Sequence, residues 1–121
     1  MHPSFPPFHS HPQFFRGKLA AYLKLNKKEA QDEDDEPNGL EIERIYVRSE
    51  FKRRGIGKFL VEYAEKISRE AGCSSMRLWV WGQNFGALAF YKSMGFVQTE
   101  SHVFMLGNDR QTALVMTKYL L

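Results

Sequence analysis

The chain has 121 residues, which supports one folded domain rather than two, because two cores of half that size would each be marginal. Its 43% hydrophobic and 26% charged residues are typical of a soluble globular protein, and no apolar run is long enough to span a membrane. The net charge of +3 is too small and too dispersed for a nucleic-acid-binding surface, so we expect neither a nucleic-acid nor a membrane partner.

Residues 1–13 form a leader rich in proline and histidine. Because proline removes backbone donors and favours extended chain, this composition predicts a disordered segment. No cysteine or carboxylate joins the leader histidines at ligand spacing, so no metal site is expected. The leader lacks the basic and apolar regions of a secretory signal, and the single cysteine, Cys73, excludes an internal disulfide. Together these features indicate a cytoplasmic protein.

Three strands are predicted after the leader. The first ends at residues 14–15, the second covers 19–25 and the third covers 40–47. A tight turn at 16–18 joins the first two strands. The polar stretch 26–39 ends in a Pro-Asn-Gly turn signal, which indicates an exposed connection. In the third strand, LEIERIYV, the alternation of side chains places Glu41 and Glu43 on one face of the sheet.

The rest of the chain predicts two helices, at 56–71 and 84–94, and three strands, at 76–81, 96–106 and 111–118. The first helix has apolar residues at helical spacing and Gly72 as its stop; the second has Asn84 as N-cap and Gly95 as C-terminal cap. The resulting order, β-β-β-α-β-α-β-β, predicts an α/β (α+β) fold with a mixed sheet. The first helix is then the crossover between two neighbouring parallel strands.

The loop between the third strand and the first helix contains two glycines and reads Lys52-Arg53-Arg54-Gly55-Ile56-Gly57-Lys58. Glycine lets the backbone approach a ligand closely, and the free N–H groups of the first helical turn point outward. Together with the helix dipole they make an anion site that suits a pyrophosphate. The pattern is neither a P-loop nor a Rossmann fingerprint, and a turn with solvated cations is the alternative.

The second predicted helix carries a candidate functional face. Asn84, Ala87 and Tyr91 share this face because they lie at positions i, i+3 and i+7. Phe90 lies on a neighbouring face that we expect to point into the core. A tyrosine beside a core phenylalanine is often only packing, with its hydroxyl reaching water, so the spacing alone leaves both interpretations of Tyr91 open.

Two blocks of sequence resemble motifs of the GNAT superfamily of N-acetyltransferases. IYVRSEFKRRGIGKFL resembles motif A, Q/R-x-x-G-x-G/A, with Lys52 where glutamine or arginine is usual, and NFGALAFYKSMGF looks like motif B. LEIERIYV, LWVW and GNDRQTALVM extend the resemblance to bacterial polyamine (spermidine/spermine) N-acetyltransferases. It runs from about residue 14 to 121 and implies a GNAT-like (acyl-CoA N-acyltransferase) domain over 14–121.

The resemblance implies acetyl-CoA as the cosubstrate and no metal. It assigns the acetyl and pantetheine portions to the backbone of Ile45, Tyr46 and Val47. It assigns the pyrophosphate to Lys52, Arg53, Arg54, Gly55, Ile56, Gly57 and Lys58. Asn84, with Ala87 on the same face, would also contact the pantetheine. Tyr91 would be the general acid. Ser93 stands where a basic residue is common, so a phosphate contact is not expected there.

The implied reaction is acyl transfer from a thioester to a primary amine. An alkylammonium with a pKa near 10.4 is neutral in only about one molecule in a few thousand at pH 7, which costs about 4.6 kcal/mol, so a base is useful. Glu43 is the candidate base, directly or through water, with Glu41 in reserve; the alternative for Glu43 is an exposed strand carboxylate. Tyr91 would protonate the leaving thiolate, and the Val47 N–H would polarise the thioester carbonyl.

Three interpretations of the activity stay open: acetylation of a polyamine or other small-molecule amine, acetylation of a protein or peptide amine, and CoA binding without turnover. GNAT domains usually begin with a strand and two helices that shape the acceptor pocket, whereas the leader stands in their place here. We therefore expect an N-terminally truncated domain with weak acetylation. Its uncovered sheet would favour association, in the simplest case as a homodimer.

Overall fold

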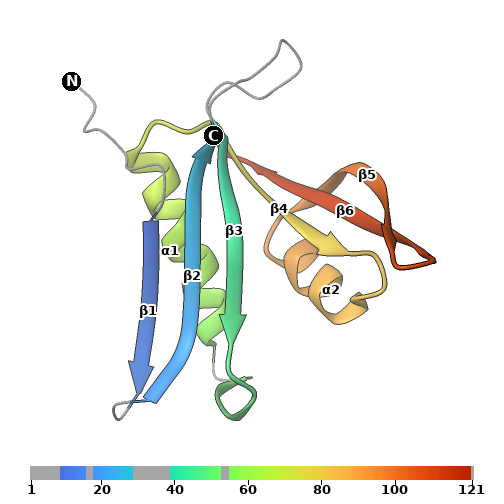
Figure 1. Ribbon diagram of the computed structural model, residues 1–121. Helices are drawn as coiled ribbons and strands as arrows, with labels where there is room; N and C mark the ends of the chain where they lie inside the picture. The colour runs from blue at the N-terminus through green and yellow to red at the C-terminus, as the bar shows by residue number, and fades with distance from the viewer. Residues whose placement is uncertain (1–8, 16–17, 29–38, 53–54, 121) are drawn as a thin grey trace.

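The computed structural model describes residues 9–15, 18–28, 39–52 and 55–120, which form one six-stranded sheet and two α-helices (Figure 1). The elements are β1 (His9–Phe15), β2 (Lys18–Lys28), β3 (Gly39–Val47), the 3₁₀ helix η1 (Ser49–Phe51), α1 (Ile56–Glu70), β4 (Ser75–Trp81), α2 (Phe85–Ser93), β5 (Val97–Leu106) and β6 (Asp109–Tyr119). The strands lie in the order β1-β2-β3-β4-β6-β5. The predicted element order and the mixed α/β fold are confirmed.

The first strand begins earlier than the sequence suggested. β1 starts at His9 and pairs antiparallel with β2, so the expectation of a disordered leader is wrong for residues 9–13; residues 1–8 lie outside the described part of the chain. Pro12 sits opposite Tyr22 within this ladder. β1 is an edge strand of the sheet, where a residue without an N–H costs no ladder bond if that side faces solvent.

The core lies between α1 and the sheet, with α1 behind β2 and β3 in Figure 1. The apolar stripe of α1 is buried as its spacing predicted, with Leu60 and Ala64 fully covered and Ile67 nearly so. Opposite them, Leu23 on β2 and Leu40 on β3 are also fully buried. Truncating such a residue to alanine typically costs about 2–5 kcal/mol of stability.

β3 and β4 are parallel, as predicted, but they pair over only three residues. Gly39, Leu40 and Glu41 face Ser75, Met76 and Arg77, after which the ladder stops although both strands continue. Figure 1 shows the strands diverging from this short junction into two arms. One arm holds β1, β2, β3 and α1; the other holds β4, β6, β5 and α2. The divergence leaves an opening in the middle of the sheet.

No helix in the described residues is long and apolar enough to cross a membrane.

Candidate active site

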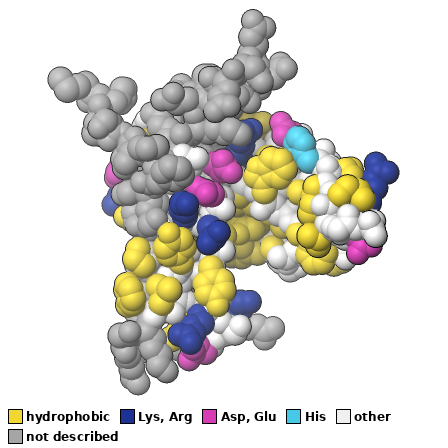
Figure 2. Space-filling model, viewed as in Figure 1, with side chains coloured by type: hydrophobic (Ala, Val, Ile, Leu, Met, Phe, Trp, Pro, Cys, Tyr) yellow, Lys and Arg dark blue, Asp and Glu magenta, His cyan; other side chains and the backbone are white. Residues whose placement is uncertain are grey.

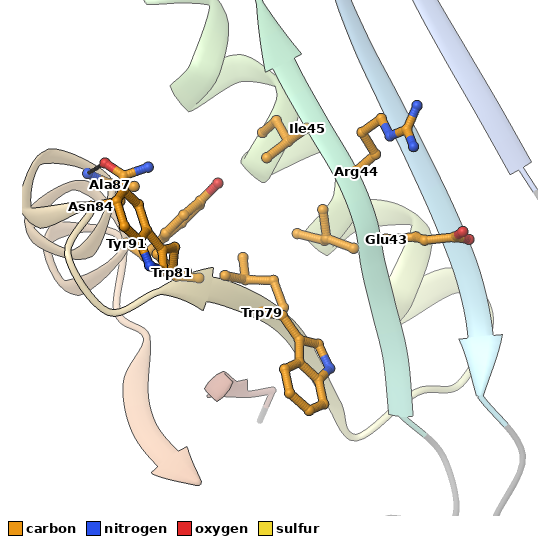
Figure 3. A pocket seen from close by; sticks show the side chains of 11 residues that line it. Glu43, Arg44, Ile45, Trp79, Trp81, Asn84, Ala87 and Tyr91 are labelled. Atoms are coloured by element: carbon orange, nitrogen blue, oxygen red, sulfur yellow. Dashed lines mark hydrogen bonds between the residues drawn. The ribbon is translucent and has the colours of Figure 1, made fainter. Parts of the chain in front are cut away.

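A cavity of about 260 Å³ lies where β3 and β4 diverge (Figure 3). It is lined from β3, β4 and α2 by Ile42, Glu43, Arg44, Ile45, Leu78, Trp79, Val80, Trp81, Asn84, Ala87 and Tyr91. Parallel strands bring their carboxyl ends to the same edge, and ligands of open α/β sheets bind at that edge. The structure therefore brings together predicted site residues that are up to 48 positions apart in the sequence, from Glu43 to Tyr91.

The end of α2 holds Tyr91 in place. Gly95 has a φ of 96°, and two hydrogen bonds close the helix: Phe96 N–H donates to the Tyr91 carbonyl at 3.0 Å, and Gly95 N–H donates to the Lys92 carbonyl at 3.1 Å. This is a Schellman motif, which needs a residue that tolerates positive φ. The Tyr91 ring packs edge-on against Phe96, with 5.6 Å between ring centroids. The run YKSMGF thus determines where the tyrosine lies.

Tyr91 is buried except toward the cavity. Its side chain is 7% exposed, and Figure 3 shows its hydroxyl pointing across the opening toward β3. Among the described residues no group hydrogen-bonds this hydroxyl. Burial disfavours the charged phenolate and raises the pKa of Tyr91 from 10.0 to about 12. The hydroxyl therefore keeps its proton at physiological pH and can donate it to a ligand.

Asn84 caps α2, as predicted. Its side-chain oxygen accepts a hydrogen bond from the Ala87 N–H at 3.2 Å, which satisfies one of the free donors of the first turn. Both residues line the cavity. Because the oxygen of Asn84 is used by the cap, its amide NH₂ is the part that can reach a ligand.

The backbone of β3 presents polar groups to the opening. The Arg48 N–H donates to the Ala20 carbonyl at 2.8 Å, toward β2. Successive N–H groups of a strand point to opposite sides, so the N–H of Val47 and that of Ile45 point toward the opening, where the ladder with β4 has ended. Tyr46 by contrast directs its backbone groups to β2, so of the three residues predicted to offer backbone groups, two face the opening.

Glu43 lies at a β-bulge. Arg44 pairs with Lys24 while Ile42 pairs with Leu25, which leaves Glu43 as the extra residue of β3. The bulge turns Glu43 and Arg44 to the outer face, opposite the core, so that Ile45 returns to the core side. The adjacent polar pair between apolar positions 42 and 45 is the sequence signal for this bulge.

The Glu43 carboxylate lies on the other side of β3 from Tyr91. The carboxylate forms an ion pair with Lys24, with 3.3 Å between Lys24 Nζ and Glu43 Oε1. Figure 3 shows it turned toward β2. Glu41 lies two residues earlier on the same outer face, at the end of the pairing with β4. The candidate acid and the candidate base therefore stand on opposite sides of the sheet, and the opening connects them.

The predicted pyrophosphate-binding loop leads into the first turn of α1. Gly55 is the N-cap residue with a φ of 79°, no described side chain caps this turn, and the turn contains no acidic residue. Gly57 lies against α2, because a Cβ there would meet the Phe90 ring at 3.4 Å. Lys52 and Lys58 are exposed beside the turn, while Arg53 and Arg54 lie outside the described residues.

Sequence reasoning missed the cavity residues of β4, including Trp79 and Trp81, and on β3 it missed Ile42 and Arg44. The alternation of LWVW was the available signal, since buried Leu78 and Val80 place both indoles on the opposite, outer face. Within the described part of the chain, no three histidine, cysteine or carboxylate side chains are grouped as metal ligands.

The sequence profile described as Acetyltransferase (GNAT) family matches residues 6–96. An uncharacterized N-acetyltransferase from the pepI 3' region of Lactobacillus delbrueckii subsp. lactis is 50% identical over 104 residues, which cover 86% of this chain and 60% of that protein. Spermidine N(1)-acetyltransferase of Thermoplasma acidophilum is 39% identical over 59 residues, covering 49% of this chain and 37% of that protein. The chain thus spans about three fifths of the first relative's length.

Solved structures share the fold over most of the chain. Nourseothricin acetyltransferase superposes with a TM-score of 0.81 at 23% identity, covering 94% of this chain and 66% of that one. The PaiA N-acetyltransferase of Thermoplasma acidophilum, crystallised with coenzyme A, superposes with a TM-score of 0.70 at 25% identity, covering 94% of this chain and 62% of that one.

Proposed function

The chain belongs to the GNAT acetyltransferase family, and we propose that it transfers the acetyl group of acetyl-CoA to a primary amine, with a polyamine such as spermidine or spermine as acceptor. The observation that carries the proposal is the opening between β3 and β4, with the protonated hydroxyl of Tyr91 pointing into it. The spermidine acetyltransferase of Thermoplasma acidophilum is the relative that supports a polyamine acceptor.

Residues of β3 and α1 fit acetyl-CoA in two independent respects. The peptide groups of Ile45 and Val47 face the opening, where no described strand pairs with them, so they can pair with the amides of a pantetheine chain. The uncapped first turn of α1 offers N–H groups and a positive dipole end to a pyrophosphate, and Gly55 leaves open space beside its Cα. Acetyl-CoA supplies the activated acetyl group as a thioester.

An ammonium acceptor loses two protons in the reaction. Glu43, on the outer face, takes the first through a water molecule, because its carboxylate is turned toward Lys24, and the neutral nitrogen then attacks the acetyl carbon. The nitrogen loses its second proton as the carbon–sulfur bond breaks, and this proton replaces the one that Tyr91 gives to sulfur. Tyr91, on the side of the sheet that α1 and α2 cover, donates its proton to the leaving sulfur. The Val47 N–H polarises the thioester carbonyl. The amine then approaches from the outer face.

The proposal is tested with the purified chain, acetyl-CoA and a panel of acceptors: spermidine, spermine, a monoamine and a peptide with a free amine. We expect CoA release with the polyamines, and a loss of about 10²–10⁴-fold in kcat for Tyr91→Phe with unchanged affinity for acetyl-CoA. Ser93→Ala is a matched control, since its hydroxyl bonds only the Phe90 carbonyl among the described groups. Turnover of the peptide alone would overturn the acceptor class, and a Tyr91→Phe variant with more than a third of wild-type kcat would overturn the role of Tyr91.

Glu43→Gln and Glu41→Gln, compared in the same assay, identify the base. Loss of the base leaves only the neutral fraction of the amine to react, so the affected variant should have its optimum shifted to higher pH. A shift in Glu41→Gln but not in Glu43→Gln would transfer the role to Glu41.

A further inference from the structure

An aromatic and acidic cluster lies on the outer face beside the cavity, and the reaction above does not use it. Its members are Trp79 on β4 and Glu100 and His102 on β5. The ring centroids of Trp79 and His102 are 4.7 Å apart with a tilt of 34°, and His102 Nε2 lies 2.9 Å from Glu100 Oε2. Figure 2 shows histidine, acidic and hydrophobic side chains gathered on this part of the surface.

The strand order explains how these side chains meet. β6 lies between β4 and β5, so Trp79 and His102 are two strands apart, roughly 9.6 Å at the usual spacing. The β6 residues between them are small: Val115 pairs with both Trp79 and Glu100, and Ala113 pairs with His102. Val115 is 1% exposed although it lies on the outer face, because the larger side chains close over it.

We propose that Trp79 and Glu100 form a subsite for a second ammonium group of the acceptor, which makes an alkyl diammonium or longer polyamine the preferred substrate. The inference rests on the proposed function and deepens it. An ammonium over an indole face is attracted by the ring quadrupole, and a nearby carboxylate adds charge attraction. Trp79 is 47% exposed, so part of its indole is available although His102 lies against it.

The cluster lies away from the Tyr91 hydroxyl, so a ligand that reaches both must be elongated. Trp79 lines the same cavity as Tyr91, and Figure 3 shows its indole extending from β4 away from the tyrosine. A molecule that places one nitrogen near the Tyr91 hydroxyl and another on Trp79 must span the cavity. A short monoamine cannot do so.

Two arginines on the outer face lie near β3, so the second ammonium of the acceptor is expected on the other side of Trp79, toward β5. Arg77 pairs in register with Glu41, and Arg44 follows Glu43 on β3. Both therefore stand beside the carboxylates of β3. Glu100 is in the register row of Trp79 and is bonded in the structure to His102, which can serve as a neutral donor. Among the described carboxylates of the outer face, Glu100 is the one in the same row as Trp79, so it can attract an ammonium bound beside the indole.

Kinetics of Trp79→Leu and Glu100→Gln test the subsite. With spermidine, each variant should raise the KM for the amine about 3- to 30-fold, the range expected for a lost cation–π contact or a lost charge partner. Glu100 does not line the cavity, so Glu100→Gln should leave kcat, the KM for acetyl-CoA and the KM for butylamine, which has no second charge, within about twofold of wild type. Trp79 lines the cavity, so for Trp79→Leu the KM for spermidine should rise about 3- to 30-fold more than the KM for butylamine. Tyr119→Leu and Glu70→Gln are controls that remove an exposed aromatic ring and an exposed carboxylate outside the cavity. Spermidine KM values within twofold of wild type in both cluster variants would overturn the subsite.

A binding measurement separates this inference from the proposed reaction. The chain has two tryptophans, so Trp81→Phe leaves Trp79 as the sole tryptophan reporter. Spermidine should change its fluorescence saturably, and adding Glu100→Gln should weaken that binding about 3- to 30-fold. Saturation without any acetyl transfer would support the subsite and overturn the proposed activity. Acetyl transfer to spermidine without a fluorescence response would support the activity and overturn the subsite.

Discussion

The chemistry proposed for Tyr91 depends on burial, which acts on the phenol and on the leaving sulfur alike. The pKa of Tyr91 is raised to about 12, whereas an ordinary thiol has a pKa near 8.5, so complete proton transfer between isolated groups would be uphill by about 5 kcal/mol. The same surroundings also disfavour a bare thiolate, which reduces this difference. Donation of a strong hydrogen bond as the negative charge develops on sulfur is therefore the minimum role of the hydroxyl.

The shifted pKa of Tyr91 also predicts how stability depends on pH. The unfolded chain loses the phenolic proton near pH 10, and the folded chain holds it to about pH 12. The folded state binds more protons in between, so the free energy of unfolding is unaffected below pH 10 and falls as the pH rises to 12, by about 3 kcal/mol in total. Urea titrations at pH 8 to 12 should show this loss in the wild type and a smaller one in Tyr91→Phe. Equal losses in both proteins would contradict the buried, protonated tyrosine.

At the scale of elements, the two glycines at the start of α1 have different physical roles. Gly55 needs its positive φ of 79°, while nothing lies within 4 Å of an added Cβ. Gly55→Ala should therefore cost about 1–2 kcal/mol from backbone strain alone. Gly57 is helical and its added Cβ would touch the Phe90 ring at 3.4 Å, an ordinary contact, so Gly57→Ala should be neutral or stabilise by up to about 1 kcal/mol. Urea unfolding of both variants checks this, and a larger loss for Gly57→Ala would refute it.

Local signals in the sequence were sufficient for most elements. The stripe of α1, the Asn84 cap and the Gly95 stop each depend on neighbours within one or two turns, and all three are confirmed. The part of β1 in residues 9–13 was missed because Pro12 argues against a strand unless the strand is known to be at an edge. Whether a strand is an edge strand depends on tertiary pairing, which composition does not reveal.

The site was harder to predict than the elements that carry it. The run IERIYV looks like a fully paired strand, and nothing in its composition says that β4 leaves it after Glu41. The motif resemblance identified Tyr91, Asn84 and the start of α1, yet the separation of Glu43 from Tyr91 across β3 follows from a bulge set by the pairing with β2. The roles of these residues remain predictions until the variants above are measured.

On the scale of the whole molecule, the two arms of Figure 1 are joined by the short β3–β4 ladder and by contacts of α1 with the second arm, including Gly57 against Phe90 of α2 and the ion pair of Glu65 with Lys118 of β6. A ligand seated in the opening would contact β3 in one arm and α2 in the other, so it should stabilise the fold as a unit. At a CoA concentration of 100 times the dissociation constant the gain is about 2.7 kcal/mol, which for a chain of this size raises the Tm by roughly 10 °C.

Hydrogen exchange gives that stabilisation a residue-level signature. CoA should slow exchange at the amides of Ile45 and Val47, which face the opening, and leave Tyr46 almost unchanged because its N–H is already bonded to β2. The alternation across three consecutive residues cannot arise from a general tightening of the fold, which would slow all three amides together. Uniform protection of 45–47, or protection of Tyr46 alone, would show that CoA does not pair with β3 as an added strand.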